Sequence, residues 1–190
     1  MYKEFVQGRI ATIRGGLDSS AAASGIFDVL DALENGTFCF RMEPWHNVSR
    51  YLSDSALAAE MLLHVISPDK GVLNYAPALE VIYARGLGRA FDELIVAATV
   101  QQAWALDQFP ISVNVRACSV SQKAFWQNLG PVLRKIRPSQ IVFELLEQDY
   151  LPSPSGRAVL KAAKRMGYRF ALDDIECSER DYRRAETFSG

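Results

Sequence analysis

The second half of the chain alternates between short apolar runs and amphipathic stretches. Apolar runs at 111–117, 140–146 and 169–175 predict strands. The stretches between them, 121–136 and 157–166, place apolar residues on one stripe and predict helices. An order of strand, helix, strand, helix, strand is typical of parallel βαβ units, so we expect an α/β fold.

The first half of the chain is less regular. Residues 37–44 alternate and predict a strand, whereas 21–33, 75–85 and 91–106 predict helices. The apolar run 56–67, interrupted by Glu60 and His64, suits either a short helix or a buried strand, since periodicity does not separate the two. Residues 1–14 show no clear period.

Length and composition predict one sizeable core. The chain has 190 residues, of which 49% are hydrophobic and 23% charged. We expect an N-terminal leader or helical segment at 1–36 and the main domain at 37–190. The net charge of −1 excludes a general nucleic-acid binder, because non-specific affinity for polyanions needs an excess of basic residues.

The cysteines and the hydropathy pattern indicate a cytoplasmic protein without a membrane span. Cys39, Cys118 and Cys177 lie far apart and form no metal-finger spacing, and their odd number argues against a disulfide framework. No run of about 18 apolar residues is present. The N-terminus lacks the basic-then-apolar pattern of a signal peptide.

Polar side chains fall late in the predicted strands. Asp173 and Asp174 end one strand, Asn114 and Glu144 lie near the ends of two others, and Glu60 interrupts the earlier apolar run. Taken singly, each suits a simpler role: Asp as a helix cap, Asn as a turn former and Glu on the surface. The carboxyl ends of parallel strands, however, share one side of the fold, where these groups would gather.

Several carboxylates in one place repel one another unless a cation lies among them. Oxygen donors alone favour Mg²⁺, Mn²⁺ or Ca²⁺ over zinc. The pattern therefore predicts a hard-metal site suited to phosphate-ester chemistry.

The same residues occur as an ordered set of motifs between residues 37 and 175. They are Glu43-Pro44, Glu60-Met61-Leu62, Asn114 in ISVNVRA, Glu144 in FELLE, and Asp173-Asp174 in LDDI. As a set, they resemble the EAL domain, the bacterial phosphodiesterase of cyclic di-GMP. The resemblance implies an α/β, TIM-barrel-like fold in which one strand runs against the others.

The resemblance also implies a site and a reaction. Two Mg²⁺ or Mn²⁺ ions and an activated water would open cyclic di-GMP to the linear dinucleotide, and Glu147 would brace the loop after the Asp pair. The implied catalytic residues are Glu60, Asp173 and Asp174; the implied substrate-binding residues are Glu43, His64 and Asn114; and the implied metal ligands are Glu60, Asn114, Glu144, Asp173 and Asp174.

Four departures from the family pattern lead us to expect weak or no catalysis. His64 replaces an arginine that grips a phosphate, Glu43 replaces a glutamine, and the loop after Asp174 has no glycine. The barrel is incomplete on its C-terminal side, and the family's catalytic lysine would lie beyond Gly190. The alternative function is a non-catalytic module that binds cyclic di-GMP or a protein in signalling. We expect a homodimer, a partner protein or segment 1–36 to cover the open barrel edge.

Overall fold

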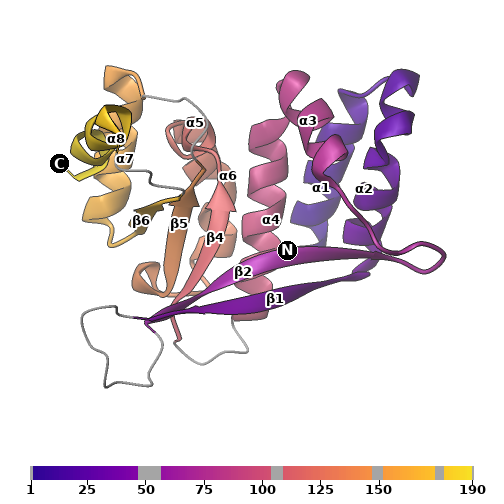
Figure 1. Cartoon of the computed structure of the whole chain (residues 1–190), viewed down its shortest axis with the longest axis horizontal. Helices are drawn as coiled ribbons and strands as arrows, with labels where there is room; N and C mark the ends of the chain where they lie inside the picture. The colour runs from indigo at the N-terminus through magenta and orange to yellow at the C-terminus, as the bar shows by residue number, and fades with distance from the viewer. Residues whose placement is uncertain (1, 47–56, 104–108, 147–151, 174–177, 190) are drawn as a thin grey trace.

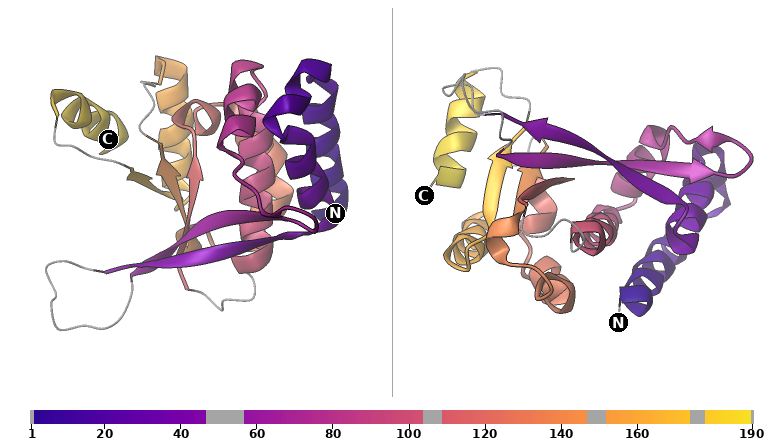
Figure 2. Two further views of the ribbon diagram at one scale, coloured as in Figure 1. Left: turned by 45° about the vertical axis from the view of Figure 1, so that its right-hand side comes forward. Right: turned by 90° about the horizontal axis from the view of Figure 1, so that it is seen from below.

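The computed structural model describes residues 2–46, 57–103, 109–146, 152–173 and 178–189. Within them, one twisted sheet carries helices α1, α4, α6 and α7 on one side (Figures 1 and 2). The strands are β1 (Phe38–Trp45), β2 (Ala58–Ser67), β3 (Gly71–Val72), β4 (Ile111–Val115), β5 (Ile141–Leu145) and β6 (Arg169–Leu172).

The sheet has the order β1-β2-β4-β5-β6, with the short β3 paired to β2. Strands β2, β4, β5 and β6 are parallel, and β1 is antiparallel to β2. This topology confirms the predicted α/β, TIM-barrel-like fold with one reversed strand. Among the described residues β6 pairs only with β5. Segment 1–36, which was one expected cover for this edge, packs mainly against α4 and β2 instead. Cover by a second copy or a partner stays a prediction.

The ambiguous run 56–67 is a strand in its described part. In β2, Ala59, Met61, Leu63 and Val65 are buried on one face, as successive side chains of a strand point to opposite sides. Glu60 and His64 are half-buried on the other face. The alternation was present in the sequence, but small and apolar residues on both faces hid it.

The helices differ from the predicted ones mainly at their ends. They are α1 (Tyr2–Gly15), the 3₁₀-helix η1 (Ser19–Ser24), α2 (Ile26–Asn35), α3 (Ala76–Ala84), α4 (Gly88–Ala103), α5 (Ala117–Val120), α6 (Lys123–Leu133), the 3₁₀-helix η3 (Pro138–Gln140), α7 (Pro154–Arg165) and α8 (Glu179–Ser189).

One predicted helix is interrupted. The stretch 21–33 is divided by Gly25, whose φ of 74° is in the left-handed region that favours glycine, so a single continuous helix over this range was wrong. The predicted helix 121–136 is present as α6 but is shorter at both ends, and it begins at Lys123 because Gln122 adopts an extended conformation after α5 has ended.

The N-terminal helices share the core of the main domain. Val6, Ile10 and Ile13 of α1 are buried, and they belong to the same hydrophobic cluster as Phe125 and Phe143. An ion pair with a buried carboxylate adds to this packing: the half-buried Arg9 of α1 lies 2.7 Å from Glu93 of α4, measured from Nη1 to Oε2. The division into a segment 1–36 and a domain 37–190 stays a prediction.

The described residues contain no helix that combines the length and the apolar character needed to cross a membrane.

Candidate functional site

The strand register brings the predicted polar residues onto one face of the sheet. Glu60 of β2 is the register partner of Ser112 in β4, and Asn114 is the register partner of Glu144 in β5. Register partners point to the same side of a sheet, as do residues two apart in one strand. The opposite face is apolar, and its Val113 and Leu145 are buried against the helices.

Asn114 and Glu60 are in direct contact across the β2–β4 junction. The Asn114 Nδ2 donates a hydrogen bond to Glu60 Oε1 at 2.6 Å. The Asn114 Oδ1 is buried and accepts no hydrogen bond from the described residues. A buried acceptor left without a donor costs about 1–3 kcal/mol, so this oxygen has the capacity to accept from, or coordinate, a further group.

Glu144 is held in place by a serine that sequence reasoning missed. Glu144 is only 6% exposed, and Ser112 Oγ donates a hydrogen bond to its Oε2 at 2.8 Å. The position of Ser112, two residues before Asn114 in the same strand, places both side chains on one face. That spacing was the available signal, but serine is too common in strands to stand out.

Asp173 lies at the same edge of the sheet. It follows the last residue of β6, and its backbone N–H donates to the carbonyl of Leu145 at 3.1 Å. Its half-buried carboxyl group is therefore one strand away from Glu144. The predicted site residues Asp174 and Glu147 lie outside the described residues.

Glu43 and His64 lie on the β1–β2 hairpin. Glu43 is the register partner of Glu60, and its carboxylate is paired with Arg41 of its own strand. His64 is the register partner of Cys39 and is half-buried. His64 and Glu60 share a face of β2, but at about 3.3 Å per residue they are roughly 13 Å apart along it. The structure thus brings Glu43, Glu60, Asn114 and Glu144 onto neighbouring strands and leaves His64 further along the sheet.

The donor set is compatible with a hard cation. All the candidate ligands are carboxylate or amide oxygens, and the buried Asn114 Oδ1 is directed away from the hydrogen bond that Nδ2 makes. Within the described ranges, no three acidic, histidine or cysteine side chains are close enough together to hold a metal ion by themselves. Asn114 Oδ1, which is not one of those groups, would therefore be needed as an additional ligand for any cation at this site.

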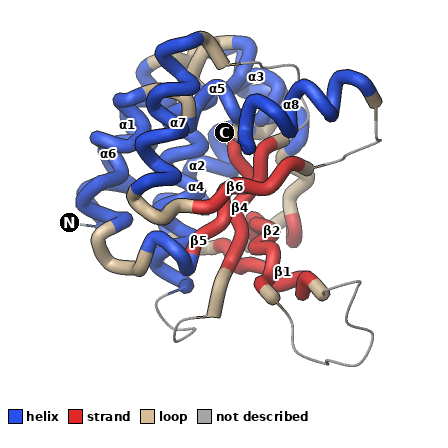
Figure 3. Tube along the Cα trace, turned by 90° about the vertical axis from the view of Figure 1, so that its left-hand side faces the viewer, coloured by secondary structure: helices blue, strands red, loops and turns tan. Residues whose placement is uncertain are grey.

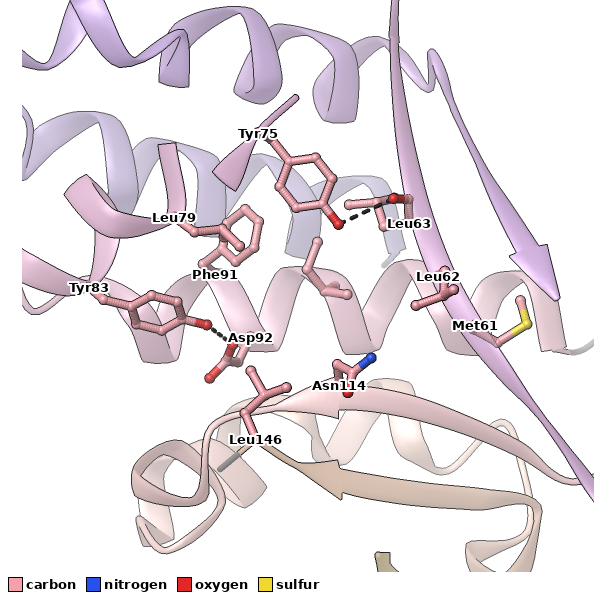
Figure 4. Close-up of a pocket in the computed structure, with 11 residues that line it drawn as sticks. Met61, Leu62, Leu63, Tyr75, Leu79, Tyr83, Phe91, Asp92, Asn114 and Leu146 are labelled. Atoms are coloured by element: carbon pink, nitrogen blue, oxygen red, sulfur yellow. Dashed lines mark hydrogen bonds between the residues drawn. The ribbon is translucent and has the colours of Figure 1, made fainter. Parts of the chain in front are cut away.

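A small cavity of about 90 Å³ adjoins Asn114, between β2, α3 and α4 (Figure 4). Its buried acid, Asp92 of α4, accepts a hydrogen bond from the Tyr83 hydroxyl at 2.8 Å and one from the Arg116 backbone N–H at 3.3 Å. The Arg116 guanidinium lies 3.6 Å from the centre of the Tyr83 ring, a cation–π contact.

Burial raises the pKa of Asp92 to about 6, although its hydrogen bonds oppose this shift. Burial also raises the pKa of Tyr83, and the neighbouring Asp92 carboxylate adds to the effect. Sequence reasoning missed both residues. The available signal was the acid in the apolar helical stretch FDELIVAA, but the sequence alone does not show that this acid is buried.

The fold and the polar residues on one face of β2, β4 and β5 define a barrel-type α/β domain with an acidic site. The family model of the EAL domain matches residues 27–188, and the chain belongs to this family. A search of curated proteins finds no match.

Solved structures of other proteins share the fold. The EAL domain of FimX from Xanthomonas citri, in complex with cyclic di-GMP, has a TM-score of 0.69 and 13% identity, covering 86% of this chain and 65% of that one. LapD from Vibrio cholerae, bound to cyclic di-GMP, has a TM-score of 0.68 and 18% identity, with coverages of 84% and 39%. The PaMucR phosphodiesterase complex with cyclic di-GMP has a TM-score of 0.64 and 20% identity, with coverages of 79% and 63%. The chain thus spans less than two thirds of each of these solved chains.

Proposed function

We propose that this domain binds cyclic di-GMP on the polar face of β2, β4 and β5 and, with a divalent cation, hydrolyses it slowly to the linear dinucleotide. The observation that carries the proposal is the contact between Asn114 and Glu60, together with the buried Asn114 Oδ1 that lacks a donor. Membership of the EAL family supports the choice of ligand, since three solved relatives are complexes with this dinucleotide.

The cation would be Mg²⁺ or Mn²⁺, held by Glu60, Asn114, Glu144, Asp173 and Asp174, the last of which lies outside the described residues. When bound, it supplies charge neutralisation at a phosphate and activation of a water. Without it, the Glu43, Glu60 and Glu144 carboxylates would repel a ligand that carries two phosphate charges. Binding of the dinucleotide should therefore depend on the divalent ion.

The protein's own contribution is to hold the oxygen donors in fixed positions. The Asn114 amide orients one oxygen of Glu60, and the Ser112 hydroxyl orients one oxygen of Glu144. Because all four residues lie on paired strands rather than on loops, their separation is set by the sheet. The arrangement can thus present several oxygens to a cation at little further cost in conformational entropy.

Binding without hydrolysis is the second candidate function, and His64 favours it. Where the family resemblance places a guanidinium, this strand carries an imidazole, which does not form two parallel hydrogen bonds to a phosphate. Glu43, in the place of a neutral glutamine, adds negative charge beside Glu60. Both changes weaken the binding of a phosphodiester. They should lower the rate of hydrolysis more than the affinity, because the reaction also depends on the alignment of the phosphodiester.

The test is incubation of the chain with cyclic di-GMP and Mn²⁺, followed by chromatography of the nucleotides. We expect slow formation of the linear dinucleotide, none with EDTA, and none with Asn114→Ala. The matched control is Asn35→Ala, the same change at an exposed position at the end of α2, which should leave the rate unchanged. Metal-dependent binding without product would support the second candidate, and neither binding nor product would contradict both.

A further inference from the structure

Helices α6 and α7 lie on the helical side of the molecule (Figure 3). Their side chains line a groove with an apolar floor. Its volume is about 500 Å³, several times that of the cavity beside Asn114. Met166 is 55% exposed there, a large value for an apolar side chain of its size. The lining residues are Lys123, Trp126, Gln127, Ala158, Val159, Ala162 and Met166.

The charge around this groove is of one sign. Segments 117–143 and 152–172, which contain α5, α6 and α7, hold nine lysines and arginines and no aspartate or glutamate. The rest of the chain holds 12 basic and 22 acidic residues, so the excess of positive charge is confined to these two segments. The helices that flank the groove are therefore basic in a chain whose net charge is −1.

Basic side chains stand on both sides of the groove. Lys123 lines it from α6, and the Arg134 guanidinium extends back over Gly130 of the same helix, with Nη1 3.8 Å from where a Cβ of that residue would be. On α7, Lys161 and Arg165 are exposed and lie three residues after the lining residues Ala158 and Ala162, which puts them on adjacent positions of the helix surface.

The lysines of α7 are crowded enough to affect one another. The pKa of Lys164 is lowered, first by partial burial and then by the charge of Lys161. Among the described residues, none of the ion pairs includes Lys123, Lys161 or Arg165. An acidic partner would thus relieve repulsion as well as gain attraction.

We propose that the α6–α7 groove is a docking site for an acidic amphipathic helix of a partner protein. The helices α6 and α7 have 11 and 12 residues, so the groove is about 16–18 Å long at 1.5 Å per residue. That length accommodates about three turns of a helix. The apolar face of the partner would contact Trp126, Val159 and Met166, and its acidic flanks would meet the basic residues on either side.

The shape of the surface argues against two other anionic partners. A membrane is flat and cannot reach Trp126 and Val159, which are half-buried between the two helices. A nucleic acid would pair its phosphates with the basic residues but would leave the floor formed by Val159 and Ala162 without an apolar contact.

The first test is fluorescence anisotropy of a labelled 18-residue peptide with leucines on one helical face and glutamates on both flanks. We expect saturable binding that weakens with added salt, and no binding of the same peptide with lysine in place of glutamate. The double variant Lys161→Glu/Arg165→Glu should bind about tenfold more weakly or worse. The control Lys3→Glu, the same charge reversal at an exposed position of α1, should bind as the unmodified chain does.

Trp126 provides a second measurement on the floor of the groove. Its Nε1 donates to the Val120 carbonyl at 2.8 Å, so the ring is fixed, and peptide docking should shift its fluorescence emission. Trp126→Phe should remove that shift while circular dichroism remains that of a folded protein. Equal affinity for the acidic and the basic peptide, tighter binding of single-stranded DNA or phosphatidylserine vesicles, or an unchanged affinity of the charge-reversal variant would overturn the proposal.

Discussion

Tyr83 and Asp92 share a hydrogen bond of 2.8 Å between the tyrosine hydroxyl and Asp92 Oδ1, in the wall of the cavity beside Asn114. The second oxygen of Asp92 accepts from the Arg116 backbone, two residues after Asn114. The carboxylate therefore connects α3, α4 and the end of β4. Because Asp92 is buried, substitution of Asp92 or Tyr83 should change the free energy of unfolding, which is measured without a ligand.

Asp92→Asn should change how stability depends on pH. The pKa of Asp92 is about 6 in the folded protein against an ordinary value of 3.8, so the folded state binds this proton more tightly. Protonation of Asp92 stabilises the folded state by about 3 kcal/mol below about pH 4, and this stabilisation is lost as the pH rises to about 6. Urea unfolding of the two proteins at pH 4.5 and pH 7 measures it: the unmodified chain should lose stability relative to Asp92→Asn over this interval.

The control for this prediction is Glu80→Gln, which also neutralises a carboxyl group but at an exposed position of α3. It should leave the pH dependence close to that of the unmodified chain, because it removes no buried carboxyl group. Parallel pH profiles for Asp92→Asn and the unmodified chain would show that the Asp92 carboxyl is not desolvated as described.

Tyr83→Phe should destabilise the protein by about 1–3 kcal/mol, because the buried Asp92 carboxylate loses a donor. The loss of that hydrogen bond should also raise the pKa of Asp92 further. Urea unfolding at pH 7 measures the first effect. A fully stable Tyr83→Phe variant would mean that a water replaces the hydroxyl at Asp92.

Arg9→Met should destabilise the chain by about 1–3 kcal/mol, because it removes one partner from a buried carboxylate. Glu93 is fully buried and, within the part of the chain that the structure describes, would keep Asn128, at 3.0 Å, and the more distant Arg89, at 3.6 Å. Thermal unfolding monitored by circular dichroism measures the loss.

Arg14→Met is the matched control for Arg9→Met, since it makes the same substitution in the same helix. Its partners, Asp31 and Glu34, are 59% and 39% exposed, so we expect less than about 1 kcal/mol. Equal losses in the two variants would contradict the view that α1 is attached to the core through Glu93.

His64→Arg should raise the affinity for cyclic di-GMP by about tenfold, because a guanidinium donates two charge-assisted hydrogen bonds to a phosphate. Calorimetry measures the affinity. Ser67→Arg is the control: it adds the same charge three residues further along β2, where the side chain points to the opposite face. An equal gain in both variants would indicate general electrostatic attraction rather than a contact from position 64.

The strands after residue 110 could be predicted because each is a compact apolar run followed by a clear helix signal. The gathering of Asn114 and Glu144 followed from the rule that parallel strands end on one side. Their pairing as register partners could not be predicted, since no local signal fixes how far one parallel strand slides past the next.

Other features were out of reach for different physical reasons. The helix α1 buries only the narrow stripe of Val6, Ile10 and Ile13, which the polar residues around it conceal. The role of Asp92 depends on Tyr83 and Arg116, which approach it only after folding. Tertiary contacts, rather than local pattern, decide both.

The role of the β2–β4 junction is tested by titration calorimetry of cyclic di-GMP binding in the presence of Ca²⁺, a hard cation that takes oxygen ligands. We expect binding that requires the ion, disappears in Asn114→Ala and persists in Asn35→Ala. Binding of equal strength in Asn114→Ala, or in the presence of EDTA, would contradict a ligand site built around Asn114 and Glu60.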